Sequence, residues 1–314
     1  MRIIVTGGLG FIGSNFVNLL TDKTDFEILV VDKETYAANR NNINGNVPLL
    51  IKDICDVTPE DLGVYDYIVH FAAESHVDNS IENGKPFIMT NVMGTFNLIE
   101  CARQNKDLKK FIHISTDEVY GDMDDNLVIN KSSKESDNLN PSSYYSSTKA
   151  SSDMIVLSAH RTYGLPYLIT RTCNNFGENQ NPEKFLPKIF KSIKDDKVIP
   201  LYGDGLHSRE WMYVKDNVKV IYDLMIDNNV INDIYNIGTS VVHNNGSIYK
   251  NKELIELISE IMGKSVSFEY VADRLGHDRK YRLCSIKLIN YYKSINKPFK
   301  PLTIKEWLKN YIKE

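Results

Sequence analysis

The sequence is poor in cysteine and contains no long apolar run. Its cysteines are scattered with no CxxC pair among them, at positions Cys55, Cys101, Cys173 and Cys284. This pattern excludes a zinc-finger spacing and a disulfide framework, and it indicates reduced thiols in the cytoplasm. No apolar stretch approaches the ~20 residues of a membrane-spanning helix. We also expect no signal peptide, because the amino terminus lacks a basic region followed by a long apolar one.

Neither sign of charge is in large excess. The net charge is −4 and the isoelectric point is about 6.0, with both signs interspersed along the chain. A nucleic-acid or membrane-surface binder needs a concentrated basic face, so we expect neither partner. The histidines His76, His113 and His277 are far apart in the sequence, and no metal site is predicted.

Short apolar runs alternate with helical patterns in the first half of the chain. The expected strands are Arg2–Thr6, Glu27–Val31, Tyr67–Phe71, Lys110–Ile114 and Pro166–Thr170, and the expected helices include Ile12–Leu20, Lys85–Gln104 and Tyr144–Tyr163. Such runs are typical of parallel strands buried on both faces. The alternation predicts a doubly wound parallel sheet, the Rossmann fold, over residues 1–172. We expect residues 173–314 to form a smaller lobe that returns some elements to the main sheet and ends in a helix over Thr303–Lys313.

The first expected strand leads directly into a glycine-rich turn. Gly7 would permit a tight turn, Gly10 would let the backbone approach a pyrophosphate, and Gly13 would allow a helix to pack closely on the strand. Phe11 and Ile12 lie where that helix begins, so its free N–H groups would face phosphate. The spacing therefore predicts a dinucleotide-binding turn.

An acidic residue follows at the end of the second expected strand. Asp32 could accept hydrogen bonds from both hydroxyls of an adenosine ribose and would repel a 2′-phosphate. NAD is therefore favoured over NADP as the cofactor, although Lys33 follows directly. Asp53 and Ile54 come after a third strand, where they would suit the adenine edge.

Tyr145 and Lys149 form a YxxxK motif on an expected helix. The i,i+4 spacing places both side chains on one helix face. A nearby cation favours the phenolate, which would lower the pKa of Tyr145 and let it act as a base near neutral pH.

Asp117 and Glu118 are adjacent, just beyond a strand's carboxyl end, where ligands bind in such sheets. Two carboxyl groups in one dry site push their pKa values apart, so that one stays protonated while the other is ionised. Removal of water across C-5 and C-6 of a hexose needs such an acid and such a base.

Together, the glycine turn, Asp32 and the YxxxK motif resemble the extended short-chain dehydrogenase/reductase superfamily. The segment STDEVYG at residues 115–121 resembles the nucleotide-hexose 4,6-dehydratases, and in particular the dTDP-glucose 4,6-dehydratase branch. Other stretches similar to this branch are Ala72–Asp78, Asn174–Gly177, Pro182–Lys184, Arg209–Trp211 and Ala272–Asp278.

The resemblance implies a hydro-lyase with an internal redox cycle on bound NAD. Tyr145 would take the C-4 hydroxyl proton as hydride passes to NAD+, Thr116 would bond the C-4 oxygen, and Lys149 would tune Tyr145 and hold the nicotinamide ribose. Glu118 would then remove the C-5 proton and Asp117 would protonate the departing C-6 hydroxyl, before hydride returns to C-6. Ala72 and Ala73 are implied to lie at the cofactor.

The same resemblance implies a nucleotide-sugar site, with dTDP-glucose, UDP-glucose or UDP-N-acetylglucosamine as substrate of a deoxysugar-forming step. A guanidinium binds phosphate oxygens in pairs, so Arg209 is the expected phosphate clamp. The other implied substrate contacts are Ser75, His76, Asn174, Asn175, Glu183, Lys184, Asn236, Arg274 and His277.

One departure from the branch leaves alternatives open. The segment Thr239–Asn245 replaces a polar run with a glutamate in a region that borders the nucleotide in the family, so the base is left open. The C-2 substituent and the C-5 configuration are open too. A nucleotide-sugar 4-epimerase would not need Asp117 and Glu118, and a dehydratase that also epimerises C-5 is a further alternative. A non-catalytic NAD-binding regulator, which would not need Tyr145 and Lys149, is a more remote one.

The two longest expected helices, Lys85–Gln104 and Tyr144–Tyr163, carry apolar residues on more than one face. Packing on the sheet accounts for only one face, and members of the superfamily commonly pair such helices into a four-helix bundle. We therefore predict a homodimer that buries residues such as Met89, Val92, Phe96, Ile155 and Leu157.

Overall fold

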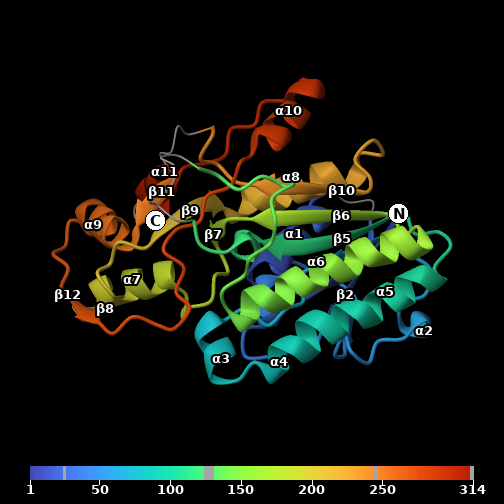
Figure 1. The fold of residues 1–314 in the computed structure, drawn as a ribbon, viewed down its shortest axis with the longest axis horizontal. Helices are drawn as coiled ribbons and strands as arrows, with labels where there is room; N and C mark the ends of the chain where they lie inside the picture. The colour runs from blue at the N-terminus through green and yellow to red at the C-terminus, as the bar shows by residue number, and fades with distance from the viewer. Residues whose placement is uncertain (24–25, 124–130, 243–246, 312–314) are drawn as a thin grey trace.

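A seven-stranded parallel sheet forms the centre of the protein (Figure 1). The computed structural model describes residues 1–23, 26–123, 131–242 and 247–311. The strand order is β10-β6-β5-β4-β1-β2-β3, and all six neighbouring pairs are parallel. The strands are β1 (Arg2–Thr6), β2 (Glu27–Asp32), β3 (Leu49–Ile51), β4 (Tyr67–His70), β5 (Lys110–Thr116), β6 (Tyr167–Thr172) and β10 (Asp233–Ile237). The predicted doubly wound sheet is confirmed.

Helices cover both faces of this sheet, which explains why its strands are apolar throughout. Ile3 and Val5 of β1 belong to a core shared with α1 (Phe11–Thr21) and α8 (Val214–Ile226). Ile4, which points to the opposite face, belongs to a core shared with α5 (Thr95–Gln104) and α6 (Tyr144–Tyr163). Alternate residues of a strand face opposite sides, so each strand supplies two separate cores.

A smaller lobe lies beyond one end of the sheet (Figure 1). It contains a three-stranded sheet of β7 (Asn174–Phe176), β9 (Ser208–Tyr213) and β11 (Ile248–Lys250), and a parallel pair of β8 (Ile199–Tyr202) with β12 (Phe268–Val271). Helices α7 (Phe185–Lys194), α9 (Asn251–Met262) and α11 (Ile304–Tyr311) pack around Phe176 and Trp211 in a third core. The later part of the chain also returns β10 and α8 to the main sheet.

The predicted helix over residues 85–104 is a composite. It consists of α4 (Lys85–Phe87), a π-helical segment η2 (Ile88–Gly94) and α5. The expected helix at the carboxyl end is α11, and Ile312 and Lys313 lie outside the described residues. The remaining elements are η1 (Arg40–Asn42), α2 (Pro59–Leu62), α3 (Val77–Glu82), η3 (Asp117–Tyr120) and α10 (Ile286–Ser294). Within the described ranges, no helix combines the length and apolarity needed to cross a bilayer.

Candidate active site

A cavity of about 950 Å³ lies between the sheet and the smaller lobe. One wall is formed by the glycine turn and by residues that follow the carboxyl ends of β2, β4 and β5. The other wall comes from α7, β9 and residues 274 and 277. This volume suits a ligand of considerable size, and its position is where doubly wound sheets bind ligands.

The glycine turn fits a dinucleotide closely. Gly7 has φ +68°, and a Cβ there would lie 2.5 Å from the backbone nitrogen of Ala72. A Cβ on Gly13 would lie 2.2 Å from the Gly7 carbonyl oxygen. Gly10 has φ −78° and its Cβ would meet nothing closer than 3.4 Å, so its lack of a side chain leaves room on the cavity side. Phe11 and Ile12 line the same wall.

Asp32 and Lys33 favour NAD over a 2′-phosphorylated dinucleotide. Asp32 lines the cavity and accepts hydrogen bonds from the backbone N–H of Leu9 at 3.0 Å and of Glu34 at 2.9 Å. The ammonium of Lys33 lies 3.4 Å from Asp53 and 3.2 Å from Glu74. Because two carboxylates already neutralise Lys33, it is poorly placed to offset the repulsion between Asp32 and a 2′-phosphate.

The π-helical segment η2 supports the cofactor wall through two buried residues. Thr90 accepts a hydrogen bond from Lys33 at 2.9 Å. The side chain of Asn91 accepts from the N–H of Glu74 at 2.8 Å and donates to its carbonyl at 3.0 Å, and it also donates to Thr148 of α6 at 2.9 Å. π-bulges are frequent at functional sites, but hydrophobic periodicity gives no sign of them, and sequence reasoning missed both residues.

Tyr145 and Lys149 lie on the first two turns of α6. A capping box between Ser143 and Ser146 begins this helix, and both catalytic candidates line the cavity. Burial raises the pKa of Tyr145 and the charge of Glu118 raises it further, while a hydrogen bond with Thr116 lowers it. Burial lowers the pKa of Lys149 to about 8, although the carboxylate of Asp153 one turn further on opposes this. The pKa of Lys149 is thus moved toward neutral pH, whereas that of Tyr145 is moved away from it, so the lowering of the Tyr145 pKa expected from the YxxxK spacing is not found.

Asp117 and Glu118 form the start of η3, directly after β5. Asp117 is only 2% exposed, and its Oδ2 atom is buried without a hydrogen-bond partner. Burial raises the pKa of Asp117 well above its usual range, and the charges of Glu118 and Glu210 raise it further. Burial also raises the pKa of Glu118, but Arg209, Arg274 and Lys184 oppose the shift. The two carboxyl groups therefore differ in their surroundings, because Asp117 lies near other carboxyl groups whereas Glu118 faces cations.

The wall opposite the glycine turn is rich in cationic side chains. It includes Lys184, Lys188, Lys191, Lys197, Arg209 and Arg274. Clefts lined by one sign of charge attract the opposite sign, so this wall suits a diphosphate. Lys188 and Lys191 lie three residues apart on α7, a spacing that could have identified them from the sequence.

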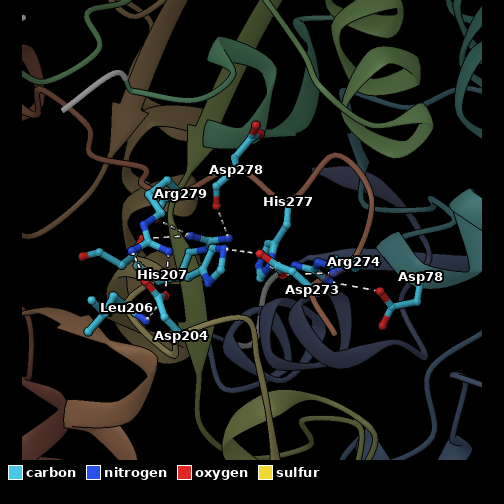
Figure 2. Close-up of polar contacts among 11 residues, drawn as sticks. Asp78, Asp204, Leu206, His207, Asp273, Arg274, His277, Asp278 and Arg279 are labelled. Carbon is cyan, nitrogen blue, oxygen red and sulfur yellow. Dashed lines mark hydrogen bonds and ion pairs between the residues drawn. The ribbon is translucent and has the colours of Figure 1, made fainter. Parts of the chain in front are cut away.

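Arg209 and Arg274 are held in different ways. The guanidinium of Arg209 donates to the carbonyls of Ser208 and Asp278, both at 2.9 Å, and it lies over the ring of Tyr281. Arg274 instead pairs with Asp78 of α3 at 3.2 Å, across the cavity (Figure 2). Arg209 is thus fixed by backbone groups, whereas Arg274 has a carboxylate partner with which a ligand phosphate would compete.

His277 belongs to a histidine–carboxylate cluster that the sequence did not reveal. Asp273 accepts from His277 Nδ1 at 2.7 Å and faces His207 Nε2 at 3.2 Å (Figure 2). The ligand atoms of the three residues lie within 4.8 Å of one another, a spacing that could hold a metal ion. The imidazoles, however, are stacked with centroids 3.6 Å apart and planes at 11°. Ring-nitrogen lone pairs lie in the ring plane, so one ion could not lie in both planes, and the geometry favours hydrogen bonding.

Most residues expected at the site line the cavity, but two do not. Those that do are Gly7, Gly10, Phe11, Ile12, Gly13, Asp32, Lys33, Ile54, Ala72, Ala73, Ser75, His76, Thr116, Asp117, Glu118, Tyr145, Lys149, Asn174, Asn175, Glu183, Lys184, Arg209, Arg274 and His277. Asp53 pairs with Lys33 and does not line the cavity itself. Asn236 is fully buried and its amide bonds Tyr120 and the carbonyl of Ser133, both at 2.8 Å, so it is a supporting residue and not a substrate contact.

The segment that departs from the dehydratase branch begins behind Arg209. The backbone N–H groups of Thr239 and Ser240 donate to the buried carboxylate of Glu210 at 2.5 and 2.6 Å. This carboxylate fixes the start of the segment, while His243, Asn244 and Asn245 lie outside the described residues.

Comparison with known proteins agrees with this geometry. Residues 3–238 match the NAD dependent epimerase/dehydratase family. The low-salt glycan biosynthesis protein Agl12 of Haloferax volcanii is 43% identical over 295 residues, which cover 91% of each chain. The dTDP-glucose 4,6-dehydratase 1 of Escherichia coli is 38% identical over 319 residues, covering 92% of this chain and 86% of that protein. The crystal structure of the dTDP-glucose 4,6-dehydratase DesIV from Streptomyces venezuelae with NAD bound superposes with a TM-score of 0.88 at 37% identity, covering 100% of this chain and 96% of that one.

The chain therefore belongs to the NAD-dependent epimerase/dehydratase family. The sequence-based assignment to the dehydratases of the extended short-chain dehydrogenase/reductase superfamily, with NAD as cofactor, is confirmed.

Proposed function

We propose that this enzyme is a nucleotide-hexose 4,6-dehydratase that converts dTDP-glucose to its 4-keto-6-deoxy derivative. The observation that carries the proposal is the pair on η3, where Asp117, whose pKa is raised by burial, stands beside Glu118 at the cavity that Tyr145 and Lys149 also line. An epimerase only oxidises and reduces one carbon, so it would have no use for a second acid and base in this position.

Three residues act at C-4. Tyr145 accepts the proton of the C-4 hydroxyl, Thr116 bonds its oxygen, and the charge of Lys149 favours the phenolate. The low exposure of Lys149 and Thr116, at 3% and 8%, excludes bulk water, which strengthens these interactions. The glycine turn and Asp32 would hold NAD, which would supply the hydride acceptor for C-4 and the hydride donor for C-6.

Dehydration falls to the carboxyl pair. Once C-4 is a ketone, the C-5 proton is acidic, and Glu118 removes it. Asp117 gives its proton to the C-6 hydroxyl, which leaves as water. Glu118 then returns a proton to C-5 as C-6 is reduced. The proton that Tyr145 took from the C-4 hydroxyl replaces the one that Asp117 gave up, so the net change is the loss of one water molecule.

The cationic wall binds the nucleotide diphosphate. Arg209, Arg274 and Lys184 lie near Glu118, and their charges all lower its pKa. Lys188 and Lys191 extend the positive wall along α7. Asn175 adds a buried side-chain oxygen that has no hydrogen-bond partner within the protein, which a ligand hydroxyl or N–H group could satisfy.

The test is product identification with three substrates. Purified enzyme is incubated with dTDP-glucose, UDP-glucose and UDP-N-acetylglucosamine, and products are identified by mass spectrometry and NMR. We expect loss of water from dTDP-glucose first. A product of unchanged mass with inverted C-4 would establish the epimerase alternative, and NMR at C-5 would detect an accompanying epimerisation.

Two further proposals concern the assembly and its compartment. The enzyme forms a homodimer through α5 and α6, supported by apolar side chains that are nearly half exposed on and before α5, namely Ile88, Met89, Met93 and Phe96. It works in the cytoplasm, a proposal supported by four cysteines that are all free thiols, as a reducing compartment would keep them.

A further inference from the structure

The two halves of the catalytic machinery stand on separate elements. Tyr145 and Lys149 belong to α6, whereas Asp117 and Glu118 belong to η3, and a long stretch of chain separates the two elements. The same sugar must be reached by both pairs, so the distance between the elements has to be fixed by packing.

Arg171 of β6 bridges these two elements. Its Nε donates to Asp153 Oδ2 at 2.9 Å, and its Nη1 donates to the hydroxyl of Tyr120 at 2.8 Å. Asp153 lies one helical turn after Lys149 on α6, and Tyr120 is the last residue of η3. The guanidinium also lies 4.9 Å from the centre of the Tyr120 ring.

The Tyr120 end of the bridge is anchored again, and the Asp153 end lies beside β5. The Tyr120 hydroxyl donates to Asn236 Oδ1 of β10 at 2.8 Å, and the second oxygen of Asp153 lies 3.4 Å from Nε2 of His113 on β5. Arg171 is 2% exposed and Asp153 is fully buried. The bridge therefore joins α6 and η3 to three neighbouring strands of the sheet.

A buried ion pair of this kind is weak evidence for stability, because desolvation of the two charges offsets much of their attraction. Geometry is a better reason for the bridge. A guanidinium presents its donors in a fixed planar fork, so it sets the distance and angle between Asp153 and Tyr120. A displacement of about 1 Å at a reacting group can cost about 10²-fold in rate.

We propose that Arg171 is a positioning residue that sets the dehydrating pair, Asp117 and Glu118, at the correct distance from the oxidising pair, Tyr145 and Lys149. It acts through Tyr120 on one side and Asp153 on the other. This inference rests on the proposed dehydratase function. Loosening the Tyr120 end releases η3 while α6 keeps its place, so elimination of water slows more than oxidation at C-4.

Tyr120→Phe tests the bridge with the loss of one oxygen atom. In single-turnover experiments, the rise of reduced-nicotinamide absorbance should stay within about 3-fold of wild type, while loss of the C-6 hydroxyl slows by about 10-fold or more, as expected for a misplaced acid–base pair. The reduced cofactor should accumulate, and solvent deuterium should enter C-5 of the sugar more slowly. Arg171→Lys keeps the charge beside Asp153 but loses the fork that also reaches Tyr120, so it should show the same split between the two steps.

Tyr292→Phe is the matched control. Tyr292 is also a buried tyrosine, and its hydroxyl bonds Asp223 at 3.0 Å, far along the chain from either catalytic pair. It should lower the melting temperature by an amount similar to Tyr120→Phe and leave both chemical steps unchanged. Equal slowing of oxidation and elimination in Tyr120→Phe, or no slowing at all, would overturn the positioning role. A wild-type enzyme that forms no 4-keto-6-deoxy sugar would instead overturn the proposed function.

Discussion

Asp117 and Glu118 are neighbours in the chain that meet different surroundings. The carboxyl of Asp117 is buried near Glu118 and Glu210, which raises its pKa, whereas Glu118 faces three cations that oppose the rise. This difference supports the proposal that Asp117 is the acid and Glu118 the base, since the group with the higher pKa keeps its proton. The order of the two residues in the sequence contained no such information.

Substitutions at these two residues separate dehydration from oxidation. Glu118→Gln should leave the first hydride transfer largely intact and block removal of the C-5 proton, so reduced cofactor builds up. Asp117→Asn should also allow oxidation but slow the loss of the C-6 hydroxyl, with deuterium exchange at C-5 retained. General acids and bases contribute about 10²–10⁴-fold, so single-turnover kinetics will resolve both effects.

Tyr145→Phe is the contrasting variant, because it removes the base for the first step. It should accumulate no reduced cofactor. Near-normal turnover in Glu118→Gln, or identical behaviour of all three variants, would make the carboxyl pair structural and the epimerase the better assignment.

At the scale of elements, the five strands predicted within residues 1–172 agree closely with β1, β2, β4, β5 and β6. β1 and α6 begin and end at the expected residues, because their apolar runs and terminal signals agree, such as Ser143 at the start of α6 and Gly164 at its end. The π-helical turn of η2 could not be predicted, since it inserts one residue into a pattern that otherwise reads as one helix. Its consequence, the placement of Asn91 beneath the cofactor wall, was missed with it.

The site shows the same division. Residues that belong to a short motif, such as Gly7 and Tyr145, could be predicted at the site, because the spacing within the motif fixes where the side chains lie. Asn236 and His207 could not be assigned correctly, because the first turns into the core and the second meets His277 only through the folding of two distant loops.

The loop at residues 273–279 should be sensitive to acid. Burial lowers the pKa of His277 to about 3, and the charges of Arg274 and Arg209 contribute, although Asp273 opposes them; His207 is stacked on the same ring. Because the ordinary value is 6.5, the unfolded chain binds a proton between pH 6.5 and 3 that the folded chain does not. The free energy of unfolding should therefore fall as the pH decreases through this window, by up to about 1.4 kcal/mol per pH unit.

Urea unfolding above and inside this window provides the measurement. His277→Gln has no such proton to gain, so its stability should depend less steeply on pH than that of the wild type. Parallel curves for the two proteins would show that His277 binds its proton at the same pH in the folded and unfolded states, and the prediction would be wrong.

At the scale of the whole molecule, three contacts cross from the main domain to the smaller lobe over the cavity. Arg274 pairs with Asp78, the Tyr36 hydroxyl donates to Glu183 at 3.3 Å, and Lys184 donates to the Ser75 carbonyl at 3.3 Å. Two of these contacts occupy cations that the proposed diphosphate would use. Binding of the nucleotide sugar must therefore replace them.

Asp78→Asn should relieve this competition at Arg274. The Michaelis constant for the nucleotide sugar should fall by up to about 5-fold, because partly exposed ion pairs are worth about 0–1 kcal/mol, and the turnover number should not change. Asp204→Asn is the control, since Asp204 pairs with Arg279 in the same loop without lining the cavity. A similar fall in both variants would point to general loosening of the loop.

The exposed apolar side chains of Ile88, Met89, Met93 and Phe96 provide the last prediction. Each is 45–49% exposed, and the segment that carries them packs beside α6, where Met154 is 48% exposed. Contiguous apolar surface of this kind is unusual on a monomer and marks an interface. Two copies meeting through α5 and α6 would bury it in a four-helix bundle, so we expect a dimer in solution scattering and sedimentation.

Phe96→Asp should produce a folded monomer, because a carboxylate at the centre of the bundle would be buried without a partner. Val64→Asp changes a more exposed apolar residue, 63% exposed on a loop outside these helices, and should remain dimeric. A wild-type mass that stays monomeric at all concentrations would rule out this interface.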